Sequence, residues 1–388
     1  MRRVPIEQLR TGDRLGRNVY ASLDALPLLC TGVRVSDSYR YLLEKAGINA
    51  VWIDDGLSQG IEPVELLAES TKQRAANAIR EAFREVAAAL GSGEAMSVEV
   101  VEEMHKVAEM IVGDVSQNLQ SALALNDLAN ADGYTLKHSL AVTALGLSIG
   151  LRVMRKYGWI DVHGHRRFDR IDERLELLGV GLLLHDIGKL AVPGEILRKP
   201  GPLDDEEWKA MRAHPMLGVQ ILRRAEGISP LARAVVRSHH ERWNGAGYPD
   251  GTIGTDIHQF ARIAAVADVF DALTSDRCYR RAMPAHDGYD FITSREGQDF
   301  DPEVVDVFKS SVAPYPPGTG VVLSDGSAGM IKEARHDALK RPVVRIVMSP
   351  DGALIEPRDI DLSTTPGLTI ASTQFEVPAD VPVPAVKR

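Results

Sequence analysis

The stretch from about residue 128 to 313 is a succession of amphipathic helical segments, and it limits the possible folds more than any other feature of the chain. In segment 135–156, His138, Val142, Leu145 and Ile149 recur at spacings of three and four, which places them on one face of a helix. Further helical segments are expected at 172–187, 204–225, 230–240 and 259–275. This pattern predicts an all-helical domain, so we expect a mainly α protein.

The segments on either side of these helices have a different character. Residues 1–62 mix short strand-like runs with turns and one helical segment at 38–45, which predicts a small α+β domain with a regulatory role. Residues 63–127 have the pattern of a helical linker. Residues 314–388 contain β-like runs separated by Gly, Pro and Asp-Gly turns, which predicts a small β-rich C-terminal extension.

A heptad-like stripe of apolar residues follows the second half of the linker. It consists of Val101, Met104, Ala108, Ile111 and Val115. Such a stripe can join two copies of the chain in a homodimer, or it can pack on a neighbouring helix of the same chain. The pattern is too short to separate these two alternatives.

Charge and composition exclude several classes of protein. The net charge of −9 argues against a general nucleic-acid or anionic-membrane surface. The most apolar segment, 140–151, is too short to span a bilayer, and residues 1–8 lack the apolar core of a signal peptide. Cys30 and Cys278 match no metal or disulfide spacing. We therefore expect a soluble protein of the reducing cytoplasm, with no DNA, RNA or membrane partner.

Histidines and aspartates of the helical stretch are the candidate metal ligands. They are His138, His185, Asp186, His214, His239, His240 and Asp268. Adjacent helical residues diverge by about 100°, so neither His185-Asp186 nor His239-His240 can bind one metal from one side. Such pairs can instead serve two neighbouring metals, with Asp186 as the bridge. Two-metal sites of this kind hold a bridging water and act on phosphoryl groups.

A glycine-rich turn follows the histidine pair at once. Its sequence is Asn244-Gly245-Ala246-Gly247-Tyr248-Pro249. Glycine allows the backbone to approach a ligand closely, because there is no Cβ to collide with it. The turn is therefore a candidate binding loop beside the expected metal pair.

Together these motifs resemble the HD-GYP family of HD-domain phosphohydrolases. The resemblance covers about residues 128 to 313 and rests on His185-Asp186-Ile187-Gly188-Lys189, His239-His240-Glu241, the Gly-Tyr-Pro turn, and the downstream run from Asp268 to Arg280. Known members hydrolyse cyclic di-GMP to linear pGpG or to GMP at a non-haem di-iron or related bimetal centre. The resemblance implies an HD-type helical catalytic domain at 128–313, between the linker and the C-terminal extension.

The resemblance also implies a role for each matching residue. The four basic HD ligands would be His138, His185, Asp186 and Asp268, and the additional ligands would be His214, His239 and His240. Catalysis would use Asp186 as the bridging ligand and Lys189 near the scissile phosphate. Expected substrate contacts are Lys189, Gly247, Tyr248, Pro249, Asp271, Arg277 and Arg280. For Asp271 the alternative is that it braces the core, and Glu241 either supports a ligand histidine or is exposed.

Two details of the sequence refine the expected cofactor. Some family members hold a third metal with a glutamate one helical turn before the first histidine, and Tyr134 occupies that position here. We therefore expect two divalent ions, iron first and Mn, Ni or Zn as alternatives. Residues 157–172 have the appearance of an insertion, and we interpret His163 and His165 within it as part of a surface loop that could cover the site.

Cyclic di-GMP phosphodiesterase is the function that the resemblance implies. One alternative is hydrolysis of another cyclic dinucleotide, because base selectivity depends on the shape of the pocket. Another is an adaptor of low activity that binds cyclic di-GMP or a diguanylate cyclase (GGDEF) protein through the Gly-Tyr-Pro surface.

Overall fold

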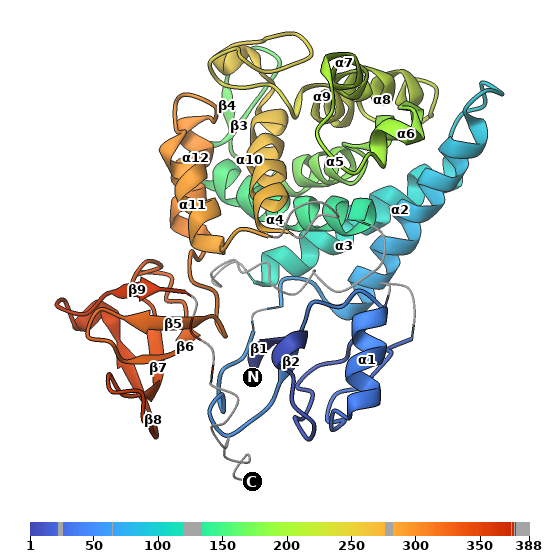
Figure 1. Cartoon of the computed structure of the whole chain (residues 1–388). Helices are drawn as coiled ribbons and strands as arrows, with labels where there is room; N and C mark the ends of the chain where they lie inside the picture. Colours follow the sequence, from blue (N-terminus) through green and yellow to red (C-terminus); the bar gives the residue numbers. More distant parts are fainter. Residues whose placement is uncertain are drawn as a thin grey trace.

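The computed structural model describes residues 1–21, 26–63, 65–118, 134–275 and 282–373, together with residues 375 and 377. A helical body lies above a small N-terminal part and a C-terminal sheet, which are side by side (Figure 1). The mainly helical class with a small antiparallel sheet at the C-terminus is confirmed. Among the described residues, no helix is long and apolar enough to cross a membrane.

The N-terminal part is built on a two-stranded antiparallel sheet. Strand β1 (Arg2–Pro5) pairs with β2 (Ala50–Ile53), and η1 (Ile6–Gln8) and α1 (Asp37–Lys45) pack beside them. Ser36 caps α1 by accepting a hydrogen bond from the Tyr39 N–H. Val19 and Leu29 form only an isolated bridge.

Two long helices lead from the N-terminal part to the helical body (Figure 1). These are α2 (Glu69–Ala89) and α3 (Val98–Gln117). The apolar stripe of α3 is buried in the same hydrophobic cluster as α2, α4 and α5. Of the two alternatives for this stripe, the structure shows packing within the chain, so a homodimer would have to use other surfaces.

The helical body is centred on α4 (Tyr134–Tyr157), α5 (Ile171–Leu183) and α10 (Gln259–Thr274), whose facing surfaces are almost completely buried. Glycines let α4 and α5 approach closely. A Cβ added at Gly146 would lie 2.7 Å from a methyl group of Leu182, and one at Gly150 would lie 2.7 Å from Leu178. Because these contacts are too short, larger residues would push the two helices apart.

Shorter elements surround this core. They are β3 (Trp159–Ile160), β4 (Arg166–Arg167), η2 (Ile187–Ala191), α6 (Gly194–Leu197), α7 (Asp205–Arg212), α8 (His214–Leu222), α9 (Pro230–Ser238), η3 (Gly254–Asp256), α11 (Ala285–Ser294) and α12 (Pro302–Ser311). The single helix expected at 204–225 was wrong. It is split into α7 and α8, because Pro215 lies in the first turn of α8 and cannot continue a preceding helix.

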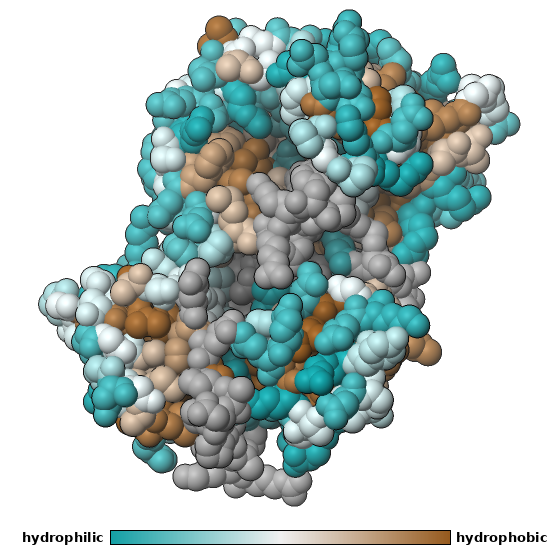
Figure 2. Space-filling model, in the orientation of Figure 1, coloured by the Kyte–Doolittle hydropathy of each residue, from teal (hydrophilic) through white to brown (hydrophobic). Residues whose placement is uncertain are grey.

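The C-terminal extension is a five-stranded antiparallel sheet of order β8-β7-β6-β5-β9. Its elements are β5 (Gly320–Leu323), β6 (Ala328–Glu333), β7 (Val343–Met348), β8 (Leu354–Asp361), η4 (Leu362–Thr364) and β9 (Ile370–Ser372). The sheet contacts the N-terminal part, because Leu57 and Ile61 form one apolar cluster with Met330 and Val347. On the face in Figure 2, hydrophilic residues cover most of the described surface, and apolar residues gather in separate patches.

A candidate metal centre

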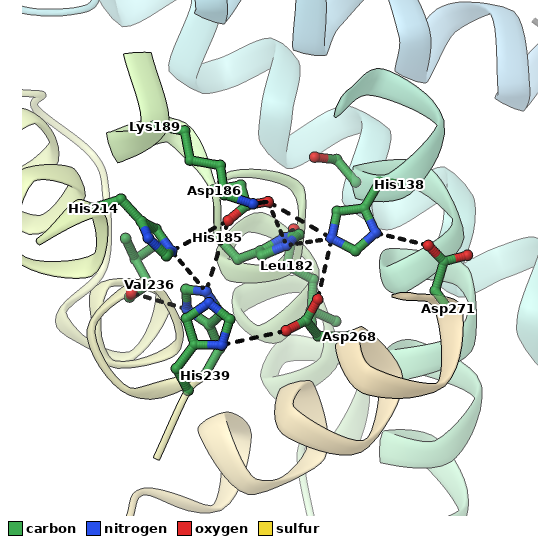
Figure 3. Close-up of polar contacts among 12 residues, drawn as sticks. His138, Leu182, His185, Asp186, Lys189, His214, Val236, His239, Asp268 and Asp271 are labelled. Atoms are coloured by element: carbon green, nitrogen blue, oxygen red, sulfur yellow. Dashed lines mark hydrogen bonds and ion pairs between the residues drawn. The ribbon is translucent and has the colours of Figure 1, made fainter. Parts of the chain in front are cut away.

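The expected ligand side chains converge at one point in the helical body (Figure 3). His138 comes from the first turns of α4, His185 and Asp186 from the turn after α5, and Asp268 from α10. His214 begins α8, and His239 and His240 follow the last turn of α9. All of them are buried except His240, which is half-buried. The helical spacing therefore brings together residues that are far apart in the sequence.

Asp186 lies at the centre of this cluster. Its Oδ1 is 3.4 Å from His214 Nε2 and 3.8 Å from His239 Nε2, whereas its Oδ2 is 3.4 Å from His185 Nε2 and 3.6 Å from His138 Nε2. Each oxygen thus faces a different pair of histidines. Metal–nitrogen bonds of about 2.0–2.1 Å place neighbouring ligand atoms roughly 3.0–3.4 Å apart. The distances suit a carboxylate that bridges two ions.

Asp268 lies close to one histidine of each of the two groups that surround Asp186. Its Oδ1 lies 3.1 Å from His138 Nε2, and its Oδ2 lies 3.6 Å from His240 Nδ1. Potential ligand atoms within 4.8 Å of one another fall into two groups that share Asp186. One group is His138, His185 and Asp186, and the other is Asp186, His214, His239 and His240. The arrangement therefore offers two adjacent binding positions.

Backbone carbonyls fix the tautomers of the histidines. The Nδ1–H groups of His185, His214 and His239 donate to the carbonyls of Leu182 at 2.7 Å, Met211 at 2.8 Å and Val236 at 3.0 Å. Since each proton is held on Nδ1, each Nε2 presents a lone pair to the centre. These three histidines are thus oriented as metal ligands.

The contacts among these side chains are unfavourable unless cations lie between them. His214 Nε2 and His239 Nε2 face each other at 3.3 Å with no proton between them, because both protons are on Nδ1. Asp186 Oδ1 is buried and has no hydrogen-bond partner among the described residues. A buried acceptor without a donor is costly. Cations would satisfy these atoms, and imidazole with carboxylate suits divalent Fe, Mn, Zn or Ni.

Burial and charge set the protonation of the metal-free site. Burial, with the neighbouring His185 and His214, lowers the pKa of His239 to about 3. Burial would also lower the pKa of His138, but hydrogen bonds to Asp268 and Asp271 outweigh it and raise the pKa to about 9. For Asp186, burial is outweighed by the charge of Lys189, which holds the pKa of the carboxyl well below its usual value. The Asp186 carboxylate is therefore anionic, as cation binding requires.

Asp271 lies behind His138 and not in the centre. Its Oδ2 is 2.7 Å from His138 Nδ1, and its Oδ1 accepts a hydrogen bond from the Ser275 hydroxyl at 2.9 Å. The side chain is buried. The expected substrate contact of Asp271 is therefore wrong for this geometry. The residue orients His138, which is a common role for a carboxylate behind a ligand histidine.

Positive groups flank the cluster on two sides. Lys189 Nζ, on η2, lies 2.5 Å from Asp186 Oδ2, and its side chain is 28 % exposed. The Arg212 guanidinium lies 4.9 Å from the ring centre of Tyr248, whose ring is 4.7 Å from that of His240. Sequence reasoning missed Arg212, although its position two residues before His214 was a usable signal. The site therefore has cations at its edge that could face an anionic substrate.

Glu241 holds the glycine-rich turn in place. The carboxylate is 1 % exposed, with Oε1 accepting from the Asp250 N–H at 2.7 Å and Oε2 from the Thr252 N–H at 3.1 Å. A Cβ at Gly247 would lie 2.4 Å from the Glu241 Cα, so only glycine fits there. Neither expectation for Glu241 was correct. It is not exposed, and its hydrogen bonds go to the loop at 241–252 and not to a ligand histidine.

The other residues singled out in the sequence are either outside the described part of the chain or away from the cluster. Arg277 and Arg280 lie outside the described residues, as does the side chain of Tyr134. His163 and His165 are exposed on the β3–β4 hairpin. This hairpin follows the far end of α4, about 28 Å along the helix from His138. The expectation that the inserted segment could cover the site was therefore wrong.

Comparison with known proteins gives an independent result. A family model for the HD domain matches residues 171–304. The chain is 31% identical over 386 residues to a cyclic di-GMP phosphodiesterase of Pseudomonas aeruginosa, covering 93% of this chain and 88% of that protein. It is 39% identical over 136 residues to the cyclic di-GMP phosphodiesterase response regulator RpfG of Xanthomonas campestris, covering 35% of this chain and 36% of that one.

A third relative has a different substrate in its name. A 3'3'-cGAMP-specific phosphodiesterase of Vibrio cholerae is 32% identical over 197 residues, which cover 50% of this chain and 37% of that protein. The relationship along almost the whole chain, together with the His-Asp and Gly-Tyr-Pro motifs, shows that this protein is a member of the HD-GYP family of HD-domain phosphohydrolases.

Proposed function

We propose that this protein is a metal-dependent phosphodiesterase that hydrolyses cyclic di-GMP to pGpG, to GMP or to both. The observation that carries the proposal is Asp186, a buried carboxylate with one oxygen facing each of two histidine pairs. The relative from Pseudomonas aeruginosa, a cyclic di-GMP phosphodiesterase similar along almost the whole chain, supports the substrate.

In this proposal the cluster holds two divalent ions, iron first and Mn, Ni or Zn as alternatives. The ligands are His138, His185, Asp186, His214, His239, His240 and Asp268. Ions held by these residues would lower the pKa of water and neutralise the charge of a phosphoryl group. The protein holds the ligand histidines in position before substrate binds, because the backbone carbonyls and Asp271 form hydrogen bonds with their rings.

Lys189, Arg212 and Tyr248 would bind the substrate. The Lys189 ammonium lies at the edge of the cluster beside Asp186, where it can neutralise the charge that develops on the phosphate. On the other side, Arg212 and Tyr248 offer a guanidinium and an aromatic face to a phosphate or a guanine. The backbone of Gly247 and Pro249, and the side chains of Arg277 and Arg280, complete the proposed contacts.

The remaining parts of the chain would control this activity. We place the domain boundaries after residues 62, 127 and 313, with residues 1–62 as the regulatory domain. Helix α2, which follows that domain, contacts η2, the segment that carries Lys189. A change in the N-terminal part can thus reach the site through one helix. The proposed protein partners are a diguanylate cyclase protein and a second copy of the chain.

The decisive experiment replaces Asp186 with Asn. Metal-loaded protein, purified and assayed without oxygen, should hydrolyse cyclic di-GMP, and D186N should lose at least about a thousandfold in kcat. The surface variant D306N, whose carboxylate pairs with Lys156, is the matched control and should keep full activity. Wild-type protein that binds two metals but leaves cyclic di-GMP intact would contradict the proposal.

A second substrate is favoured by one observation, which is the similarity to a 3'3'-cGAMP-specific phosphodiesterase over half of the chain. The same assay with 3'3'-cGAMP separates the two, since kcat/KM should be higher for the true substrate. The adaptor alternative makes a different prediction. In that case D186N would abolish hydrolysis but leave the cellular output unchanged.

A further inference from the structure

A cavity lies in the helical body, away from the candidate metal centre. Its volume is about 410 Å³, and it lies between the β3–β4 hairpin and the start of α10. Trp159, Val162, Leu231 and Phe260 form its apolar walls. Asp268, the metal-centre residue of α10, is about 15 Å further along that helix than His258. A volume of this size suits a small organic molecule.

Arg174 presents an unpaired charge at this cavity. Its guanidinium stacks 4.0 Å from the ring centre of Trp159. Within the described part of the chain, the side chain has no hydrogen bond or ion pair, and it is half-buried. A guanidinium stacked on an aromatic ring keeps its N–H donors available in the plane of the fork. The stacked guanidinium therefore offers oriented N–H donors to an anion, beside an apolar surface.

His258 adds a neutral donor. Its Nδ1 accepts a hydrogen bond from the Phe260 N–H at 3.2 Å, so the proton of the neutral ring is on Nε2. Burial, followed by the charges of Arg262 and Arg174, lowers the pKa of His258 to about 4. The ring is therefore neutral at physiological pH, and two guanidinium groups influence it.

Arg262 provides a buried donor without a partner. Its side chain is only 4 % exposed, and its Nη1 donates to Asp301. Its Nε is buried as well and makes no hydrogen bond with the described residues. A buried donor of this kind is unfavourable unless an acceptor reaches it. Carboxylates also line the cavity. Asp161 accepts hydrogen bonds from the His163 and His165 N–H groups, and Asp256 is exposed.

We propose that this cavity binds a small organic anion with a flat apolar or aromatic body. The body would lie against Trp159 and Phe260, and the acidic group would accept hydrogen bonds from Arg174, His258 and Arg262. Nothing in this assignment depends on the phosphodiesterase reaction.

The test is isothermal titration of the full-length protein with naphthalene-1-sulfonate and with its neutral counterpart naphthalene-1-methanol. The sulfonate should bind with a stoichiometry of one, about tenfold or more tightly than the alcohol. Arg174→Met should reduce sulfonate affinity to that of the alcohol, and Arg84→Met, on the exposed face of α2, should have no effect. D186N should bind the sulfonate normally, which separates this site from the metal centre.

Equal binding of the two compounds, no binding of the sulfonate, or undiminished binding to Arg174→Met would overturn the proposal. If Arg174→Met lowers the melting temperature, Arg174→Lys decides the matter. It keeps the charge and the stem but loses the fork, so it should bind the sulfonate more weakly than the wild type and more tightly than the alcohol. Unchanged affinity in that variant would also contradict the assignment.

Discussion

Replacing Glu241 with Gln should loosen the loop at 241–252 without unfolding the protein. The two carboxylate oxygens accept hydrogen bonds from the Asp250 and Thr252 N–H groups, and the side chain is almost completely buried. Glutamine has the same shape, but its NH₂ group would face one of these two donors. The variant thus loses one charge-assisted hydrogen bond and leaves a buried N–H without an acceptor.

The magnitude follows from these two contacts. A hydrogen bond to a charged group contributes about 1.5–3 kcal/mol. We therefore expect the free energy that keeps the loop closed to fall by about 2–3 kcal/mol. This corresponds to an increase of about 30- to 150-fold in the population of the open loop. Since Tyr248 is in this loop, the KM for cyclic di-GMP should rise, whereas the metal content should stay at the wild-type level.

Hydrogen exchange measures the loop directly. The amides of Asp250 and Thr252 should exchange about 30 to 150 times faster in Glu241→Gln, while amides in α4 keep their protection. Glu173→Gln is the matched control, because its exposed carboxylate pairs with Arg170 on the surface. If the two amides exchange at the wild-type rate, the assigned role of Glu241 is refuted.

Three further predictions concern the metal centre and its edge. Asp271→Asn removes the carboxylate behind His138 and should weaken metal binding by about 10- to 100-fold in chelator competition, with D306N unchanged; equal affinity would contradict the positioning role. A proton bound to His138, whose pKa is about 9 without metal, must leave when the metal binds. Metal affinity should therefore rise with pH from 6 to 9, and calorimetry in buffers of different ionisation enthalpy should detect proton release; a flat profile would oppose this. Lys189→Met should reduce kcat by about 10²–10³-fold, whereas Lys199→Met, whose ammonium pairs with Glu207 and not with Asp186, should not.

Periodicity in the sequence predicted the helical body and most of the candidate ligands. Apolar residues at spacings of three and four place His138 on the buried face of α4. The two groups of candidate ligands share Asp186, but the expectation that His239 and His240 serve different metals was wrong, because both lie in the group of Asp186 and His214. Local patterns sufficed here because each ligand lies on a helix or directly after the end of one.

Other features depend on contacts that no local pattern contains. The hydrogen bonds of Glu241 go to backbone N–H groups nine and eleven residues later, so its role is decided by the path of the loop. Arg212, the last residue of α7, meets Tyr248 in the loop after α9, because α7 and α9 both contact α8. The inserted hairpin could not be placed without the direction of α4, which carries it away from His138.

The central claim is that Asp186 bridges two metal ions, and anomalous diffraction from crystals of metal-loaded protein tests it most directly. Two peaks about 3.5–4 Å apart are expected, one on the side of His138 and His185 and the other on the side of His214, His239 and His240. A single peak, or peaks that Asp186 does not contact, would contradict the account.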